Sequence, residues 1–180
     1  MDLATHQRKL LSLFKSTYRS SSEDDAYIQK VAQSRDLEEG RRNIFLWRVW
    51  VLERTSVLTF RLLKQRKLLE ECLQAFITQH NISPFRETQA PDFLEAMSTY
   101  PDSLIASVAQ FELALIKVRQ GDSRSYVVAW NVEPHAVLNS LAKDIPLDDN
   151  FLEGEYEIVV SRGIPSQFQI RHRAQRSATP

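Results

Sequence analysis

The sequence predicts an α+β fold: a helical N-terminal region followed by a small three-stranded antiparallel β-sheet with one intervening short helix. Apolar residues recur at helical spacing up to Gly121, whereas β-branched and aromatic residues dominate the apolar runs after it. Within 180 residues we therefore expect a helical domain over 1–120, a small β-sheet peptide-recognition module over 121–172 and a disordered tail over 173–180.

The first two helices are predicted from spacing and from a capping pattern. Leu3, Leu10, Phe14 and Tyr18 follow helical periodicity, which indicates a helix over 3–18. The hydroxyls and acids of residues 20–25 then form an N-terminal cap signature. A second helix is expected to run through Tyr27, Ile28 and Val31 after this cap.

The segment from Asn43 to His80 contains neither glycine nor proline. Residues 44–52 are apolar except for Arg48, and a helix that is apolar nearly all round is buried on several sides. We expect this helix to lie at the centre of the body with Trp47 and Trp50 in the core. Partial exposure of the two indoles at a protein interface is the functional alternative.

Charged residues 64–67 are a candidate break before a further helix over 68–79, and one long helix or two both remain open. Proline favours the first turn of a helix. Pro91 is therefore expected to open a helix over 92–97, and Pro101 one over 102–118 that ends at Gly121 with a left-handed cap.

Three strands are predicted, over 125–130, 155–161 and 167–171, with a short helix opening at Glu133 and Pro134 between the first two. Alternation places Tyr156, Ile158 and Val160 on one face of the second strand, and a hairpin loop over 162–166 leads into the third.

Acidic residues concentrate in the C-terminal half. The whole chain is neutral, but residues 122–157 contain eight acids and two bases, a net charge of −6. Such a segment repels phosphate and attracts basic partners.

We expect no catalytic residues and no metal site in this chain. None of the four histidines has a His or Cys three or four residues away, and the single cysteine, Cys72, lies on an apolar helical stripe typical of a buried small hydrophobe. The four glycines are too far apart to form a phosphate loop. One cysteine and no apolar span are expected for a cytoplasmic protein with no membrane contact.

Nucleic acid is not an expected partner. Arg41 and Arg48 share one helical face, but Arg54 and Arg61 share another, and a phosphate-binding stripe should keep one face and bring a basic excess. Glu155 and Glu157 share a strand face and could act as an acid–base pair, but surface charge or a docking patch is the preferred interpretation.

The small sheet is the feature that best suggests a function. Three strands leave two open edges, and an open edge can accept an extended peptide as an added strand. A meander would leave 167–171 outermost, so we favour that edge; the alternative is that the helical body covers one edge and the other is merely short. The expected peptide-binding residues lie on the edge strands and their acids: Tyr126, Val128, Trp130, Glu155, Glu157, Gln167, Phe168, Gln169, Ile170 and Arg171.

Several short motifs resemble a known family when taken in order. They are Tyr100-Pro-Asp102, Phe111-Glu-Leu-Ala114, a strand ending in Trp130, Pro134 with Val137, Leu138 and Leu141, Tyr156-x-Ile158-x-x-Ser161-Arg162 and Phe168-x-Ile170. This order is similar to the C-terminal half of the partner proteins of multinuclear non-heme iron oxidases. With the Arg41–Arg48 helix included, the chain resembles the partner subunits of methanobactin biosynthesis.

The resemblance implies a heterodimer with a TIM-barrel enzyme that holds the iron ions, so no cofactor is expected in this chain. The pair would use dioxygen to convert cysteines of a precursor peptide into oxazolone and thioamide groups. This subunit would capture the basic leader of the precursor as a strand added to its sheet. Related proteins carry an N-terminal region described as DNA-binding, so a nucleic-acid-binding or transcriptional accessory protein is the alternative function.

Overall fold

The α+β prediction is confirmed by a computed structural model, which describes residues 2–79, 85–148 and 151–172. Helices precede a three-stranded antiparallel sheet in the order β1-β2-β3, with one helix between β1 and β2. The elements are α1 (Leu3–Phe14), α2 (Ala26–Ala32), α3 (Arg35–Thr55), α4 (Val57–Gln65), α5 (Leu69–Gln79), α6 (Arg86–Met97), α7 (Ser103–Arg119), β1 (Tyr126–Val132), α8 (Pro134–Lys143), β2 (Glu153–Val160) and β3 (Phe168–His172). The predicted tail over 173–180 lies outside the described residues.

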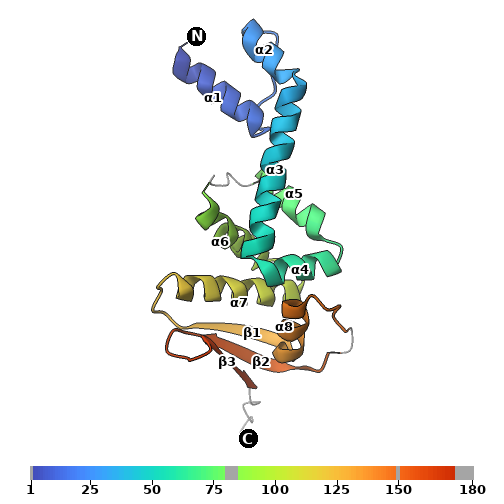
Figure 1. Ribbon diagram of the computed structural model, residues 1–180, viewed down its shortest axis with the longest axis vertical. Coiled ribbons are helices and arrows are strands. Elements are labelled where there is room, and N and C mark those ends of the chain that lie inside the picture. Colours follow the sequence, from blue (N-terminus) through green and yellow to red (C-terminus); the bar gives the residue numbers. More distant parts are fainter. Residues whose placement is uncertain (1, 80–84, 149–150, 173–180) are drawn as a thin grey trace, which may run out of the picture.

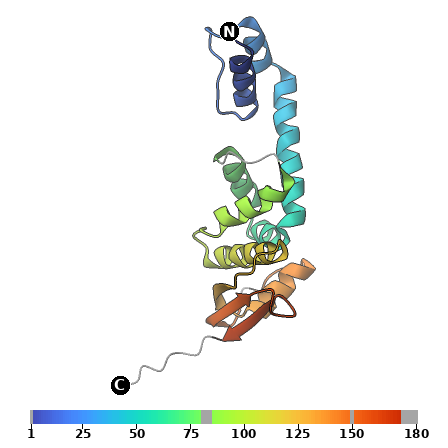
Figure 2. The same ribbon diagram turned by 90° about the vertical axis from the view of Figure 1, so that its left-hand side faces the viewer.

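The molecule is elongated along α3. Helices α1 and α2 lie at one end of α3, whereas the sheet and α8 lie at the opposite end of the molecule (Figures 1 and 2). Two hydrophobic clusters follow this division. A small one gathers Leu13, Ile28 and Leu37 from the first three helices. A large one extends from Leu52 to Val160, so the predicted helical region and the sheet share one core.

Helices α1 and α2 are joined to the rest by polar contacts as well as by packing. The Arg41 guanidinium of α3 donates to the carbonyl of Leu13 at the end of α1. Before α2, Asp24 accepts from Lys9 at 2.5 Å and from the Tyr18 hydroxyl at 2.6 Å. Hydrogen bonds from Lys9 and Tyr18 hold the pKa of Asp24 well below its ordinary value.

The prediction that residues 44–52 form a buried central helix is wrong. Only Val51 and Leu52 are buried, whereas Trp47 and Trp50 are each 43% exposed and Leu46 is 51% exposed. Helix α3 packs against α1 near its start and against α6 and α4 further along. Between these contacts it is a single straight helix (Figure 1). An apolar sequence predicts neighbours on all sides of the helix, but the described neighbours cover only part of its surface.

Two helix boundaries also differ from expectation. The chain breaks first at Ser56, which ends α3, and then at residues 66–68, where Lys67 adopts a left-handed φ of 59°. The second break lies next to the charged residues 64–67, where the sequence predicted a candidate break. Pro91 does not open a helix but lies inside α6, which begins at Arg86. Its missing N–H removes one helical hydrogen bond, and the burial of Phe93 and Leu94 keeps the helix continuous across it.

Helix α7 is the centre of the large cluster, since α4 and α6 pack on it from one side and β1 and β2 from the other (Figure 1). Its start is capped by Asp102, and Gly121 follows its end with φ 107°, as predicted. The Glu112 carboxylate, 8% exposed, accepts 2.9 Å hydrogen bonds from the backbone N–H groups of Leu58 and Thr59. It therefore caps the start of α4 from another helix.

The faces of the sheet follow the predicted alternation. Tyr126, Val128 and Trp130 of β1 pair with Val160, Ile158 and Tyr156 of β2, and Phe168 and Ile170 of β3 extend the same inner face. Phe168 meets Phe111 of α7 edge to face, with ring centroids 5.2 Å apart. Residues of the other parity, including Glu155 and Glu157, face away from the helices.

None of the described helices combines the length and apolar character needed to cross a bilayer.

We expect Glu112→Gln to destabilise the fold by about 1–3 kcal/mol, because an amide NH₂ then faces a backbone N–H that needs an acceptor. Burial raises the pKa of Glu112, so the folded state holds this proton more tightly than the unfolded chain. The stability that this proton binding adds to the folded state is fully present below the ordinary carboxyl pKa. It is lost as the pH rises through the raised pKa. Urea unfolding of both proteins between about pH 4.5 and about pH 8 should show that the difference in their free energies of unfolding shrinks as the pH rises. A deficit that grows with pH would contradict this assignment, and exposed Glu95→Gln is the control.

Candidate functional site

The sheet is a meander, as expected, so β1 and β3 are its two outer strands and β2 lies between them. The predicted peptide-binding residues all lie on these three strands or directly before β3. Whether an outer strand can accept another strand depends on which of its backbone groups point outward and on what lies beside them.

The pairing of β2 with β3 determines which backbone groups of β3 point outward. The N–H of Ser161 donates to the carbonyl of Gln167 at 2.9 Å, so this is a hydrogen-bonded pair of the antiparallel ladder. Because such pairs alternate along the ladder, Gln169 and Arg171 also direct their backbone groups toward β2. The N–H and carbonyl groups of Phe168, Ile170 and His172 then point toward the outer side.

Among the described residues, β3 packs chiefly against β2, and its outer side has one side-chain hydrogen bond. The Ser166 hydroxyl donates to the Phe168 carbonyl at 2.6 Å and so caps the first outward acceptor. Beyond it, Ile170 and His172 direct their backbone groups away from β2, and β2 is the element against which β3 chiefly packs. Figure 1 shows β3, with the rest of the sheet, at the end of the molecule opposite α1 and α2. An extended peptide could hydrogen-bond to Ile170 there.

The same alternation determines which backbone groups of β1 point outward. Its outward residues are Val127 and Ala129, because their β2 partners Val159 and Glu157 direct their backbone groups toward β3. Helix α7 closes part of this edge. The Ser107 hydroxyl donates to the Ala129 carbonyl at 2.8 Å, and the Asn131 side chain donates to the Ser103 hydroxyl at 3.0 Å.

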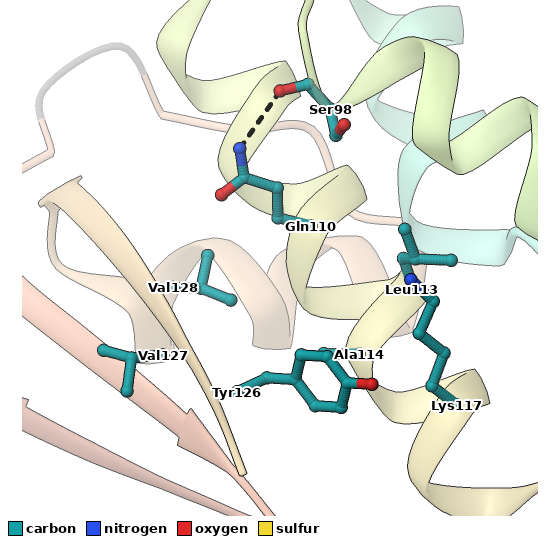
Figure 3. Close-up of a pocket in the computed structure, with 8 residues that line it drawn as sticks. All are labelled: Ser98, Gln110, Leu113, Ala114, Lys117, Tyr126, Val127 and Val128. Carbon is teal, nitrogen blue, oxygen red and sulfur yellow. Dashed lines mark hydrogen bonds between the residues drawn. The ribbon is translucent and has the colours of Figure 1, made fainter. Parts of the chain in front are cut away.

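A small pocket of about 180 Å³ remains beside the other half of β1. Figure 3 shows its lining from three segments, with the Gln110 amide bonded to the Ser98 carbonyl at 3.0 Å on one side. The lining residues are Ser98, Gln110, Leu113, Ala114, Lys117, Tyr126, Val127 and Val128. Helix α7 supplies Gln110, Leu113, Ala114 and Lys117 to this lining, and β1 supplies Tyr126, Val127 and Val128.

Two of the three predicted β1 residues lie in the core. Val128 and Trp130 are each 3% exposed, with their side chains in the core and their backbone groups directed to β2. Val127 and Ala129 hold the outward groups, and sequence reasoning missed both. Side-chain alternation was visible in the sequence, but the lateral direction of each peptide group depends on register, which the sequence pattern does not give.

The acidic surface is smaller than the segment charge suggested. Asp122 is bonded to Arg124 at 2.6 Å and to the Tyr126 hydroxyl, and these hydrogen bonds hold its pKa well below the ordinary value. Glu133 caps α8 through two backbone N–H groups, and Asp144 lies 3.8 Å from Arg61. These three acids support local structure.

Three further acids of this segment gather on the outer face of the sheet. Glu153, Glu155 and Glu157 alternate along β2 and therefore share that face. Glu155 is exposed, and Glu157 lies opposite Arg171 of β3. The acidic face is thus a row of three carboxylates on the central strand, one strand away from the outer edge of β3.

The arginines considered for nucleic acid make internal bonds. Arg41 bonds to Leu13 as described above, and Arg61 donates to the carbonyls of Leu141 and Ala142, each at 2.8 Å. Burial lowers the pKa of Arg48. These contacts tie helices together and do not form one basic stripe.

Within the described ranges, no three His, Cys, Asp or Glu side chains gather as a metal ion would need. Cys72 is buried in the large cluster, as expected of a small hydrophobe, and burial raises the pKa of its thiol.

No protein-family model matches the chain, and no curated protein matches it either. The resemblance to oxidase partner subunits therefore stays a prediction, and the function below is argued from the geometry of the sheet.

A proline scan of β3 tests the orientation of its backbone. Gln169→Pro should cost at least about 2 kcal/mol more than Gln169→Ala, because it removes an N–H that faces β2. Ile170→Pro should cost little beyond Ile170→Ala, since the lost N–H faces outward. Thermal and urea unfolding of the four variants measure this difference, and equal proline penalties at the two positions would show that the assigned orientation is wrong.

Proposed function

We propose that this chain is a non-catalytic recognition subunit that binds the leader of a ribosomally made precursor peptide as a fourth strand beside β3. The observation that carries the proposal is the outer side of β3, where Ile170 and His172 direct backbone groups away from β2. Backbone hydrogen bonds of this kind bind extended peptides with little dependence on sequence.

The β3 edge is preferred to the β1 edge because strand addition needs several outward residues in succession. On β1, the Ser107 hydroxyl occupies the Ala129 carbonyl, and Asn131 is tied to Ser103. Only Val127 is left for an incoming strand. On β3, Ser166 caps the outward carbonyl of Phe168 at the start of the strand, and within the described part of the chain Ile170 and His172 offer further outward groups.

Charge favours a basic peptide. Glu153, Glu155 and Glu157 line the outer face of the neighbouring strand, and a lysine side chain of the added peptide could reach across β3 toward them. Charge complementarity of this kind chiefly raises the association rate and selects against acidic peptides. Arg171 offsets part of the negative potential near Glu157. Glu155 should therefore contribute more than Glu157 to the binding of a basic peptide.

Binding the leader raises the local concentration of the peptide's cysteines at the active site of a partner enzyme. We propose that this partner is a TIM-barrel multinuclear iron oxidase, that it supplies the iron chemistry for oxazolone and thioamide formation in methanobactin biosynthesis, and that the complex is cytoplasmic. The residues of this chain would hold and orient the peptide.

A lysine–valine alternating peptide with a fluorescent label serves as the probe for the edge. Ile170→Pro should abolish binding in fluorescence anisotropy, whereas Ile170→Ala retains the outward N–H and should keep most of the affinity. Val127→Pro, at the other edge, should leave the affinity unchanged. Loss of binding in Val127→Pro with full binding in Ile170→Pro would move the site to β1 and overturn the proposal.

Charge reversal tests the acidic face separately. The double variant Glu155→Lys/Glu157→Lys should weaken binding of the same peptide by about tenfold at low salt, and the loss should shrink as salt screens the charges. Glu70→Lys/Glu95→Lys makes the same change of charge at exposed helical positions. If both double variants weaken binding equally, the acidic face has no specific part in recognition.

A further inference from the structure

The pocket between α7 and β1 has no part in the proposed function. It lies at the β1 edge, and β2 separates that edge from β3. Its apolar lining includes Leu113, Ala114 and Val128, which are 8%, 3% and 3% exposed and belong to the large hydrophobic cluster. The volume of about 180 Å³ is below the roughly 300–1,000 Å³ of sites for drug-sized ligands, so it suits a smaller apolar group.

Hydrogen bonds hold the polar parts of the lining in place. On one side, the Gln110 amide donates to the Ser98 carbonyl at 3.0 Å (Figure 3). On the other side, the Tyr126 hydroxyl donates to the Asp122 carboxylate at 2.6 Å, and Arg124 donates to the same carboxylate at 2.6 Å. The ring of Tyr126 is therefore a fixed wall. A pocket arranged in advance loses less conformational entropy when a ligand enters it.

Lys117 is the charged residue among the eight that line the pocket. Its ammonium lies 5.9 Å from the centre of the Tyr126 ring, and within the described ranges this ring is its one partner. A lysine in the last turn of a helix often interacts with the final carbonyls. Figure 3 instead shows the Lys117 side chain extending back along α7 toward Leu113, beside the Tyr126 ring. Its three N–H donors therefore lie along the pocket, where a carboxylate is a stronger acceptor than a ring face.

We propose that this pocket binds a small carboxylic acid. The apolar part of the acid packs against Leu113, Ala114 and Val128, and its carboxylate pairs with the ammonium of Lys117. One cation in an otherwise uncharged lining matches one negative charge. A phosphate carries nearly twice that charge and is usually held by several cations or backbone N–H groups, so it fits this lining less well.

The contacts beside the pocket favour a free acid over a peptide. Helix α7 closes the rest of the β1 edge, since the Ser107 hydroxyl donates to the Ala129 carbonyl at 2.8 Å and the Asn131 side chain donates to the Ser103 hydroxyl at 3.0 Å. A peptide that continued along β1 as a strand would have to break these bonds. A small molecule that ends inside the pocket leaves them intact.

A series of three small ligands tests the proposal on the full-length protein. NMR titration with 3-phenylpropanoate should shift the amide signals of Ala114, Val127 and Val128, with a dissociation constant on the order of 1 mM. The neutral 3-phenylpropanamide and the ring-free acetate should each bind at least about tenfold more weakly, because one lacks the charge and the other lacks the apolar part. Equal binding of the acid and its amide, or shifts confined to other parts of the molecule, overturns the proposal.

A matched pair of lysine variants tests the charge. Lys117→Met keeps the length of the side chain and should weaken 3-phenylpropanoate binding about tenfold, with no remaining preference over the amide. Lys143→Met makes the same change at an exposed lysine in the last turn of α8 and should bind as the wild type does. Unchanged affinity in Lys117→Met, or equal losses in both variants, would show that Lys117 does not hold the carboxylate.

A peptide arm separates a free acid from the end of a chain. The tripeptide glycyl-glycyl-phenylalanine ends in the same phenylpropanoate unit but carries further backbone. It should bind more weakly than 3-phenylpropanoate, since its backbone meets the part of the β1 edge that α7 closes. Tighter binding of the tripeptide would show that the pocket takes a chain end, which contradicts the assignment to a free acid.

Discussion

The carboxylate of Glu112 lies where the two halves of the body meet. It accepts the N–H groups of Leu58 and Thr59, so the start of α4 is capped by α7 and not by its own preceding residue. Helix α7 in turn covers the inner face of the sheet through residues such as Phe111. This buried contact joins α4 to α7, and α7 in turn packs on the strands that carry the β3 edge.

The sequence predicted most helices and all three strands because each carries a local signal. Asp102 caps α7, Glu133 caps α8 and Gly121 ends α7, and each of these acts within a few residues. The break at Ser56 was missed because its cause is not local: the cap of α4 comes from Glu112, more than fifty residues away. Pro91 was misplaced for a related reason, since the packing of Phe93 and Leu94 outweighs one lost hydrogen bond.

Burial of α3 was predicted wrongly because an apolar sequence does not say what the helix packs against. Trp47 and Trp50 were expected in the core, yet α3 stands out from the body with them half exposed. The candidate site was predictable only in part. Its strands and its acidic face could be read from alternation, as Glu155 and Glu157 illustrate. The directions of the peptide groups, and so the distinction between Ile170 and Gln169, required the register.

Amide hydrogen exchange, resolved to single residues by NMR, tests the central claim that β3 accepts a peptide strand. On addition of the lysine–valine peptide, the Ile170 amide should become protected, because it gains a partner on its outer side. The Gln169 amide already bonds to β2 and should change little, and the Val127 amide on the opposite edge should stay as it was. Protection that appears at Val127 while Ile170 exchanges as before would contradict the account.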